Sequence, residues 1–441
     1  MSQLLSFREA HFFGLPSQSN VYGMTNLSTA SNSILVASLR NPAIYTIEFH
    51  KTTERILPST KEIHFTYIPS GAEIISIGAF NKSDLGNDFV IGITFIKVAI
   101  PDRMAIDNQT SAQYLNIYFD WESGPDFNLD SIAQSCTSVS LVFIPYQLYN
   151  TKIFNGDVQE TVWLLSGSDA QIHLYRENKS MHKFVEESVK EQFPEFDKLP
   201  SIVMWMNIVN IEANEKRLTA IGCEDGYLGV FYVNTETKTI EANWDICHDG
   251  PITYLQFFTT SSTIKVPVCL ESVSKLTDSN DPSFHLLVTN SLEPSVVYRN
   301  VLKDGLENQL ILPDSDHYDC VLCACVADVD MDGRNEIVLG TYGQEILIYK
   351  YNGDNINSES DSEEFCLEPE YYLKWQKSFA YPLHSIKYID ITNDGMNELI
   401  VLSLKGMHIL QHPSEEVAKV CAGRLAQLIE KLKGERKCIE S

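Results

Sequence analysis

The stretch Asp328–Tyr349, DVDMDGRNEIVLGTYGQEILIY, joins an acidic loop to two short apolar runs and decides the fold. The loop places acidic side chains at intervals, with a glycine after the third: Asp328, Asp330, Asp332, Gly333 and Glu336. The two runs that follow, 336–341 and 345–349, flank a short turn and have the pattern of a β-hairpin. The same order of loop and hairpin returns 62 residues later, from Asp390 to Leu410. A strand-hairpin unit at this period predicts a β-propeller or a related array.

The hairpin pattern recurs along the whole chain, and its units start about 50 to 70 residues apart. Seven units match: Ile34–Ile47, Phe89–Tyr118, Thr161–Tyr175, Leu218–Tyr232, His285–Tyr298, Ile337–Tyr349 and Leu399–Leu410. The runs between hairpins also repeat, because Trp244 and Trp375 each stand seven residues before a Pro-led apolar run. These runs supply an outer strand and the next inner strand. The sequence therefore predicts an all-β, seven-bladed β-propeller with four strands per blade.

The last unit contains inner strands but lacks an outer strand before the pattern becomes helical near Pro413. We expect the N-terminal run Phe7–Leu15 to supply that strand and so to close the ring, with Asn20–Leu27 as the inner strand of the first blade. Residues 1–412 would then form the propeller. Residues 413–441 form a C-terminal amphipathic α-helix, with Ser414 as its N-cap.

The C-terminal helix has an apolar stripe at three- and four-residue spacing. The stripe consists of Val417, Cys421, Leu425, Leu428 and Leu432. It could cap the side of the propeller or dock on a partner helix or groove, and the sequence leaves both open.

Three polar segments poor in periodicity are predicted to be loop insertions on one face: Ala99–Ala112, Thr259–Pro282 and Tyr351–Pro369. The third contains an acidic, Ser-rich run near 358–362, which is read as a solvated linker or as a phosphorylation site. Ser180–Phe193 has helical spacing and predicts a short helix between strands.

Composition restricts the classes of function. The formal net charge is −26, which disfavours nucleic-acid binding and binding to anionic membranes, since both require a basic surface. The chain contains no apolar run of 18 residues, so we expect no membrane insertion. The N-terminus does not have the pattern of a secretory signal. The ten cysteines are then expected to be reduced thiols in a soluble intracellular protein.

The acidic loops are the strongest chemical signal. Asp328, Asp330, Asp332 and Glu336, with the Arg334 carbonyl, could hold calcium as in the FG-GAP repeats of integrin-type propellers, which the last two blades resemble. Against this, the loop ends in Glu where that family usually has Asp. The second copy has Thr392 in place of an acid. The alternative is an Asx-turn loop, in which Asp and Gly order the crossing between strands through hydrogen bonds to the backbone.

Other candidate chemistry is weaker. Cys320, Cys323 and Cys325 resemble half of a zinc site, but no second ligand pair lies at a useful distance. Cys247 and His248 are neighbours on a strand, so their side chains point to opposite faces. The chain has no nucleophile elbow, phosphate-binding loop or zinc-protease motif. We therefore predict a protein that is not an enzyme; a metal-dependent propeller enzyme would rest on the acidic loops alone.

Several colinear segments together resemble the kaptin family of FG-GAP-like propellers. They are Ser17–Gly23, Gly92–Lys97, Leu129–Cys136, Leu164–Tyr175, Glu293–Arg299, Thr341–Glu345 and Ser403–His412. The insertions and the C-terminal helix contribute little to the resemblance.

This resemblance implies a scaffold subunit of the KICSTOR complex that pairs with a second FG-GAP propeller protein. The family's assembly recruits the GTPase-activating GATOR complex to lysosomes and restrains TOR signalling on amino-acid starvation. The location implied is cytoplasmic and peripheral at the lysosomal membrane. The alternative is a cytoskeletal protein associated with actin filaments at actin-rich cell edges. The family offers no active-site residues to carry over.

Overall fold

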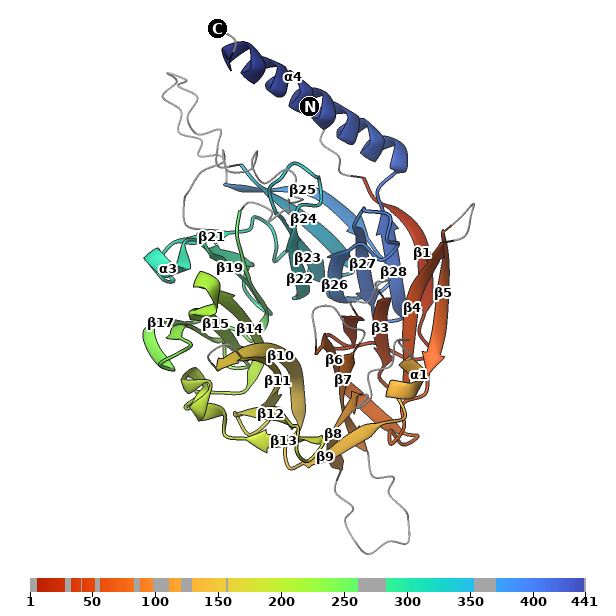
Figure 1. Ribbon diagram of the computed structural model, residues 1–441, viewed down its shortest axis with the longest axis vertical. Helices are drawn as coiled ribbons and strands as arrows, with labels where there is room; N and C mark the ends of the chain where they lie inside the picture. Colours follow the sequence, from red (N-terminus) through yellow and green to blue (C-terminus); the bar gives the residue numbers. More distant parts are fainter. Residues whose placement is uncertain are drawn as a thin grey trace, which may run out of the picture.

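The computed structural model describes residues 6–27, 33–40, 42–51, 56–82, 88–97, 111–119, 129–155, 158–260, 283–352 and 370–439. Within these ranges the strands form seven four-stranded antiparallel sheets, arranged as the blades of a ring (Figure 1). The predicted seven-bladed propeller is therefore confirmed. The three predicted insertions lie almost entirely outside the described residues, as does the acidic run near 358–362.

Blades 1 to 6 are each built from four consecutive strands, running from the centre of the ring outward. Blade 1 contains β2 (Met24–Leu27), β3 (Ser33–Ser38), β4 (Ala43–Lys51) and β5 (Ile56–Ile63). Blade 2 contains β6 (Ala72–Asn81), β7 (Phe89–Lys97), β8 (Ala112–Phe119) and β9 (Cys136–Leu141). Blade 3 contains β10 (Pro145–Asn155), β11 (Val158–Gly167), β12 (Ile172–Asn178) and β13 (Lys183–Glu187).

Blade 4 contains β14 (Val203–Ile211), β15 (Lys216–Cys223), β16 (Tyr227–Asn234) and β17 (Thr239–Cys247). Blade 5 contains β18 (Ile252–Phe258), β19 (His285–Asn290), β20 (Val296–Tyr298) and β21 (Gln309–Ile311). Blade 6 contains β22 (Val321–Ala327), β23 (Glu336–Thr341), β24 (Glu345–Tyr351) and β25 (Tyr371–Ser378). Blade 7 contains β26 (Leu383–Ile389), β27 (Glu398–Ser403) and β28 (Gly406–Gln411), completed by β1 (Arg8–Gly14).

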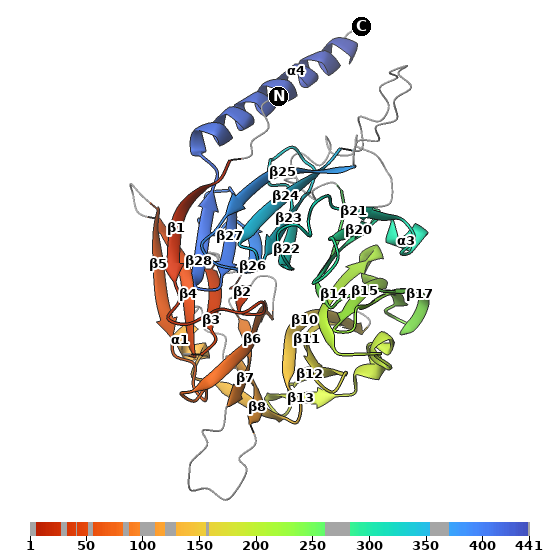
Figure 2. The ribbon, with the colours of Figure 1, turned by 180° about the vertical axis from the view of Figure 1, so that it is seen from behind.

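The pairing of β1 with β28 closes the ring, as the sequence predicts. The two strands are antiparallel, with Phe13 opposite Met407. The closure continues past β1, because the Leu15 and Ser19 backbone N–H groups donate to the carbonyls of Lys405 and Leu404. Both ends of the chain therefore share one blade, and Figure 2 shows β1 beside β28 from the opposite side.

The core lies between blades, and the second strands of blades 6 and 7, β23 and β27, are buried along their whole length. Close packing there requires small residues on one blade against large ones on the next. A Cβ at Gly92 in β7 would lie 2.6 Å from Leu148 Cδ2 and 3.2 Å from the Trp163 ring of blade 3. Such contacts lock each blade to its neighbour, because protein interiors pack without room for an added methyl group.

Helices are few among the described residues. They comprise α1 (Leu129–Ile132), α3 (Val301–Asp304), three 3-10 turns (Val189–Glu191, Pro194–Phe196 and Glu212–Asn214) and α4 (Ser414–Ile439). None of the described helices is long and apolar enough to cross a membrane.

The helix predicted over Ser180–Phe193 is wrong. The segment instead holds β13, the outer strand of blade 3, followed by one 3-10 turn at Val189–Glu191. Pairing of β13 with β12 and burial of Phe184 outweigh the local helical spacing.

Candidate functional site

The first acidic loop, residues 328–335, connects β22 to β23 in blade 6. The Asp328 carboxylate accepts hydrogen bonds from the backbone N–H groups of Asp332 and Gly333, at 2.9 and 2.8 Å. Gly333 has a φ of +92° with no atom near its missing Cβ, so the turn requires glycine for its backbone conformation and not for space. Asp330 and Asp332 each accept the backbone N–H two residues on, from Asp332 at 3.1 Å and from Arg334 at 3.0 Å, and these are the Asx-turns expected as one alternative.

A lysine ammonium lies at the centre of the acidic side chains. Lys350 Nζ, from β24, is 2.6 Å from an oxygen of each of Asp330, Asp332 and Glu336. The register of β23 and β24 explains this contact, because Ile337 pairs with Tyr349 and so Glu336 stands opposite Lys350. Lys374 from β25 forms a second ion pair with Asp330. Two lysines from the neighbouring strands β24 and β25 thus supply positive charge to the acidic loop.

The cluster is buried, and desolvation raises the pKa of Glu336 even with Lys350 beside it. Asp330, Glu336 and Lys350 are all buried, and Glu336 also accepts the backbone N–H groups of Val329 and Asp330. Burial alone would lower the pKa of Lys350, but its three hydrogen bonds to carboxylates raise it above the usual value. Burial likewise opposes ionisation of Asp332, yet the bond to Lys350 leaves the pKa of Asp332 below its usual range. Lys350 is therefore a fixed cation.

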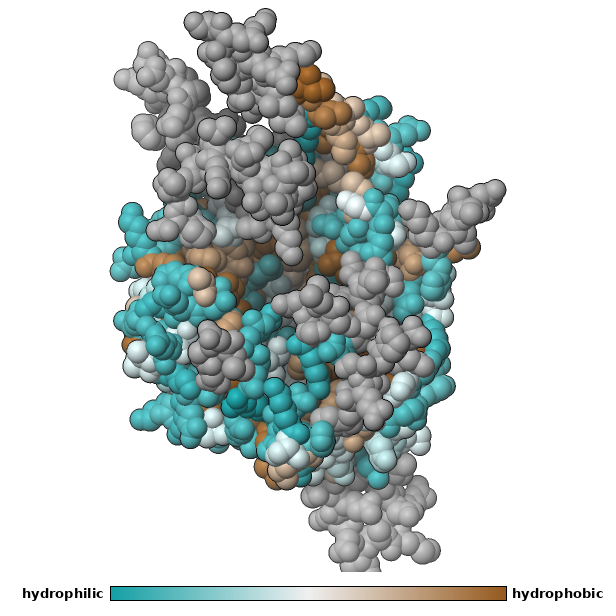
Figure 3. Space-filling view, viewed as in Figure 1, coloured by the Kyte–Doolittle hydropathy of each residue, from teal (hydrophilic) through white to brown (hydrophobic). Residues whose placement is uncertain are grey.

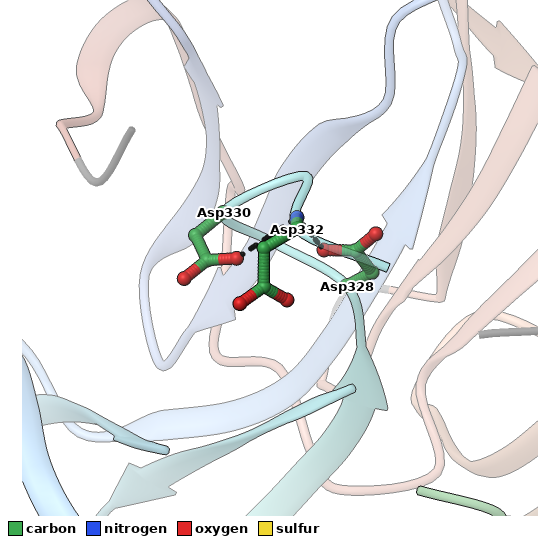
Figure 4. A group of neighbouring side chains, drawn as sticks. All are labelled: Asp328, Asp330 and Asp332. Carbon is green, nitrogen blue, oxygen red and sulfur yellow. Dashed lines mark hydrogen bonds between the residues drawn. The ribbon is translucent and has the colours of Figure 1, made fainter. Parts of the chain in front are cut away.

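Calcium fits this loop poorly. Oxygens of Asp328, Asp330 and Asp332 lie within 4.8 Å of one another, and Figure 4 shows the three side chains gathered on one loop. Two of them, with Glu336, are already bonded to the Lys350 ammonium. A divalent ion would have to share these oxygens with that ammonium at close range, and like charges a few Å apart repel strongly when water is excluded. The residues fit a lysine better than a metal ion.

The second acidic loop, residues 390–397 in blade 7, has the same backbone but different chemistry. The Asp390 carboxylate again accepts two backbone N–H groups, from Asp394 at 3.3 Å and Gly395 at 2.9 Å. Glu398 accepts the Ile391 N–H at 2.9 Å, and the Thr392 hydroxyl and Gln411 amide both donate to its other oxygen at 3.0 Å.

Thr392 and Gln411 occupy the positions that Asp330 and Lys350 hold in blade 6. The first match follows from the loops, since each residue comes two after the first aspartate. The second follows from strand register, because Leu399 pairs with Leu410 and so Glu398 stands opposite Gln411. The negative and the positive member of the blade 6 ion pair are both absent from blade 7. Glu398 is therefore bonded by neutral donors, and one of its oxygens lies within 4.8 Å of an oxygen of Asp390 and of Asp394.

The cysteine candidates do not form a site. Cys320 and Cys323 donate to the carbonyls of Val321 and Gly340, and burial raises the pKa of both thiols. Cys325 joins neither of the two groups of possible metal ligands found among the described residues. Cys247 is likewise bonded to backbone carbonyls.

His248, the neighbour of Cys247, bonds Glu293 at 2.7 Å and the Tyr298 hydroxyl at 3.2 Å. Cys247 is the last residue of β17 and His248 lies just after it, so the two are not neighbours on one strand, and their side chains have separate partners.

The first turn of α4 is anchored on the propeller. Val417 is buried, the Ser6 hydroxyl donates to Glu416 at 2.6 Å, and the rings of Phe7 and His412 lie 4.1 Å apart. Beyond this turn Cys421 is exposed, and so is Leu425, at 59%. Figure 3 shows hydrophobic side chains exposed along the described part of the helix. The structure describes Leu428 and Leu432 as helical and leaves their side chains undescribed.

Sequence reasoning missed the lysines. Lys350 and Lys374 stand 14 and 38 residues after Glu336, and no spacing motif links them to the loop. The available signal was hairpin register: counting outward from the turn at 342–344 places Lys350 opposite Glu336. Lys387, which lines the central cavity, carried no sequence signal.

Comparison with known proteins identifies the chain's relatives. Residues 7–422 match the family described as KICSTOR complex protein kaptin. The mouse (Mus musculus) protein of that name is 40% identical over 425 residues, covering 96% of this chain and 92% of the relative.

Solved structures share the fold at low identity. One is BBS1N, from its complex with ARL6DN, with a TM-score of 0.51, 10% identity, and coverage of 92% of this chain and 97% of that one. The Dos1 propeller has a TM-score of 0.50 and 11% identity, with coverage of 92% and 95%. These likenesses support the propeller fold alone, whereas the sequence matches extend over nearly the whole chain. The chain belongs to the family of the KICSTOR complex protein kaptin.

Proposed function

We propose that this chain is a non-enzymatic scaffold subunit of a KICSTOR complex, in which it pairs with a second FG-GAP propeller protein. In this role the assembly holds the GTPase-activating GATOR complex at the lysosome and restrains TOR signalling when amino acids are scarce. The observation that carries the proposal is the 40% identity to a curated kaptin across 96% of the chain. An identity of that extent covers every blade and leaves no blade to a different architecture.

The exposed part of α4 supports a partner-binding role. Leu425 and Ile429 are 59% and 43% exposed, four residues apart on one face of the helix. Large apolar side chains aligned on a projecting helix are typical of helix-in-groove recognition. Among the described side chains of α4, the contact with the propeller lies in the first turn, where Val417 is buried. We therefore assign the exposed side of α4 that carries Cys421, Leu425 and Ile429 to contact with a partner subunit; Cys421 and Leu425 belong to the predicted stripe and Ile429 does not.

Affinity purification from cells tests the proposal. Tagged full-length protein is compared with a chain ending at His412, and partners are identified by mass spectrometry. We expect the full chain to recover a second propeller protein and GATOR components. Recovery of actin as the main stoichiometric partner, without these proteins, would contradict the scaffold role and favour the cytoskeletal one.

Point variants locate the contact more sharply than the truncation. Leu425→Asp combined with Ile429→Asp places charge on the apolar face and should abolish partner recovery. Gly423→Asp is the matched control, because residue 423 lies on the opposite side of the helix and has no atom within 4 Å of its missing Cβ. Equal partner recovery by both variants would remove α4 from the interface while leaving complex membership to the full-chain result.

A further inference from the structure

The centre of the ring encloses a cavity of about 520 Å³ lined by the innermost strands of all seven blades. This volume is within the range of small-molecule sites in proteins. Its lining is polar and aromatic. Side-chain amides come from Asn26, Gln147, Asn150, Asn207 and Gln256, and aromatic rings come from Tyr22, Tyr149, Trp205, Tyr254 and Tyr388. Among the described residues that line it, Lys387 is the one Asp, Glu, Lys or Arg.

Aromatic side chains line the cavity at the end where the inner strands begin. Tyr22, just before β2 of blade 1, donates its hydroxyl to the Met204 carbonyl of blade 4 at 2.6 Å. Its ring stacks on Trp205 at 5.6 Å, and Trp205 lies 4.7 Å from Tyr254 of blade 5. Blades 1 and 4 are not neighbours in the ring, so these contacts cross the axis. They form an aromatic wall at one end of the cavity.

Several of the lining amides already serve the fold. Gln147 of blade 3 accepts the Met206 N–H of blade 4 at 2.7 Å, and Asn207 of blade 4 accepts the Phe257 N–H of blade 5 at 2.9 Å. These bonds tie neighbouring blades together around the axis. The amides themselves contribute no charge to the cavity, since they are neutral donors and acceptors.

Lys387 differs from these amides. Its ammonium donates to the Asn26 side-chain oxygen of blade 1 at 2.9 Å and forms no ion pair with a described carboxylate. Water can reach it from the cavity, yet protein surrounds it on all sides, and this desolvation lowers its pKa to about 8. The ammonium is therefore still mostly protonated at neutral pH.

The walls supply no opposing charge. Burial raises the pKa of the Tyr254, Tyr388, Cys323 and Cys325 side chains, so these groups remain neutral. A cation held in partly desolvated surroundings without a carboxylate partner attracts an anion more strongly than an exposed lysine does. Lys350 is the contrasting case in this chain, because its three carboxylates already satisfy it.

We propose that the central cavity binds a small organic anion, whose carboxylate or phosphate pairs with Lys387 and whose body lies against the aromatic wall of Tyr22, Trp205 and Tyr254. This site is separate from α4 and does not depend on membership of a complex. The cavity volume admits a ligand of roughly 10 to 20 non-hydrogen atoms and excludes a folded domain or a polymer.

The test is calorimetric titration of the purified full-length protein with three probes: sodium benzoate, benzamide and inorganic phosphate. Benzamide matches benzoate in shape but lacks the charge. We expect benzoate, phosphate or both to bind while benzamide binds at least about tenfold more weakly. Benzoate binding identifies a carboxylate ligand, and phosphate binding alone identifies a phosphorylated one. Absence of measurable binding by both anions at 10 mM, or equal binding of benzamide, would overturn the proposal.

Variants separate the site from the fold. Lys387→Met should weaken anion binding at least about tenfold, whereas Lys387→Arg, which keeps the charge, should retain it within a fewfold. Lys183→Met is the matched control, because Lys183 is exposed on the outer strand of blade 3. Circular dichroism and the melting temperature confirm that each variant is folded. If Lys387→Met binds the anions as well as the unchanged protein does, Lys387 is not the counter-charge and the proposal fails.

Discussion

The acidic loops of blades 6 and 7 have the same backbone hydrogen bonds, and a buried glutamate follows each of them. Different side chains bond this glutamate in the two blades. In blade 6, Glu336 accepts a hydrogen bond from the Lys350 ammonium, which also bonds two aspartates, so the residues form a buried ion cluster. In blade 7, Glu398 meets Thr392 and Gln411, so the loop is a network of neutral donors around one acid. The backbone bonds from Asp328 and Asp390 are shared by both.

This difference teaches that the number of acids in such a loop does not by itself identify a metal site. The residue on the third strand of the blade that stands opposite the glutamate determines whether the glutamate is bonded by a cation or by a neutral donor. Where that residue is lysine the loop carries an additional aspartate, and where it is glutamine the aspartate is replaced by threonine. The two blades also differ in closure, because β1 comes from the other end of the chain.

The largest expected effect concerns closure. Removing residues 1–15 deletes β1 and leaves β28 as an unpaired edge, with the side chains that face β1 uncovered. We expect a loss of about 5 kcal/mol or more of stability, seen as a large fall in melting temperature and in solubility. A chain ending at His412 is the control, since it removes α4 but no strand. Equal melting temperatures for the two truncations would contradict a closing role for β1.

The next effect separates the two loops. Lys350→Met leaves Asp332 and Glu336 without a counter-charge and Asp330 with Lys374 alone, and should cost about 3–5 kcal/mol. Gln411→Met removes one neutral hydrogen bond to Glu398 and should cost about 1–3 kcal/mol. Denaturant unfolding of both variants measures the difference. Equal losses would show that the Lys350 cluster is no stronger than the neutral network.

The next prediction concerns how the stability of blade 7, which closes the ring, depends on pH. The ring of His384 in β26 accepts or donates a bond to the Ser19 hydroxyl at 2.8 Å, and burial lowers its pKa to about 4. The unfolded chain takes up a proton below about pH 6.5 while the folded one stays neutral, so stability falls as pH drops from 6.5 to 4. The slope is about 1.4 kcal/mol per pH unit for one such group.

His384→Asn should therefore flatten the decline in melting temperature over that pH range. The exposed His50→Asn is the control and should leave the pH profile unchanged. A profile for His384→Asn that superimposes on that of the unchanged protein would show that this histidine is not held neutral in the fold.

A smaller effect comes from converting one loop into the other. Lys350→Gln combined with Asp330→Thr installs in blade 6 the pair found in blade 7. We expect the double variant to be more stable than Lys350→Gln alone by about 1–3 kcal/mol, because removing Asp330 removes its repulsion with Asp332 and Glu336, which Lys350 no longer offsets. Additive losses in a double-mutant cycle would contradict coupling between positions 330 and 350.

The smallest expected effect is that of calcium. Addition of about 1 mM calcium should leave the melting temperature of the unchanged protein the same, because Lys350 already occupies the acidic cluster. In Lys350→Met the cluster loses its ammonium, and calcium should raise the melting temperature. Stabilisation of the unchanged protein by calcium, lost on chelation, would instead support the metal site expected from Asp328, Asp330, Asp332 and Glu336.

Much of this fold could be predicted because each blade repeats a local pattern. The hairpin expected at 336–349 is β23 and β24, and the expected outer strands around Trp244 and Trp375 are β17 and β25. The helix over Ser180–Phe193 failed because the spacing of its apolar residues also suits an outer strand, and pairing across the sheet decides between them. Lys350 escaped prediction because its contact depends on register across a turn, and Lys387 because it depends on seven blades meeting at an axis.

The pairing of β1 with β28 has a consequence for biosynthesis. β1 is made before β28 and has to wait for that partner until the strands of all the blades between them have been made. Throughout translation the early blades lack a closed ring, and the edge that β1 presents must avoid other strands. Closure is thus a contact of very high sequence separation, which folds slowly, and a ribosome that stops short of Gly406 releases a chain unable to complete its last blade.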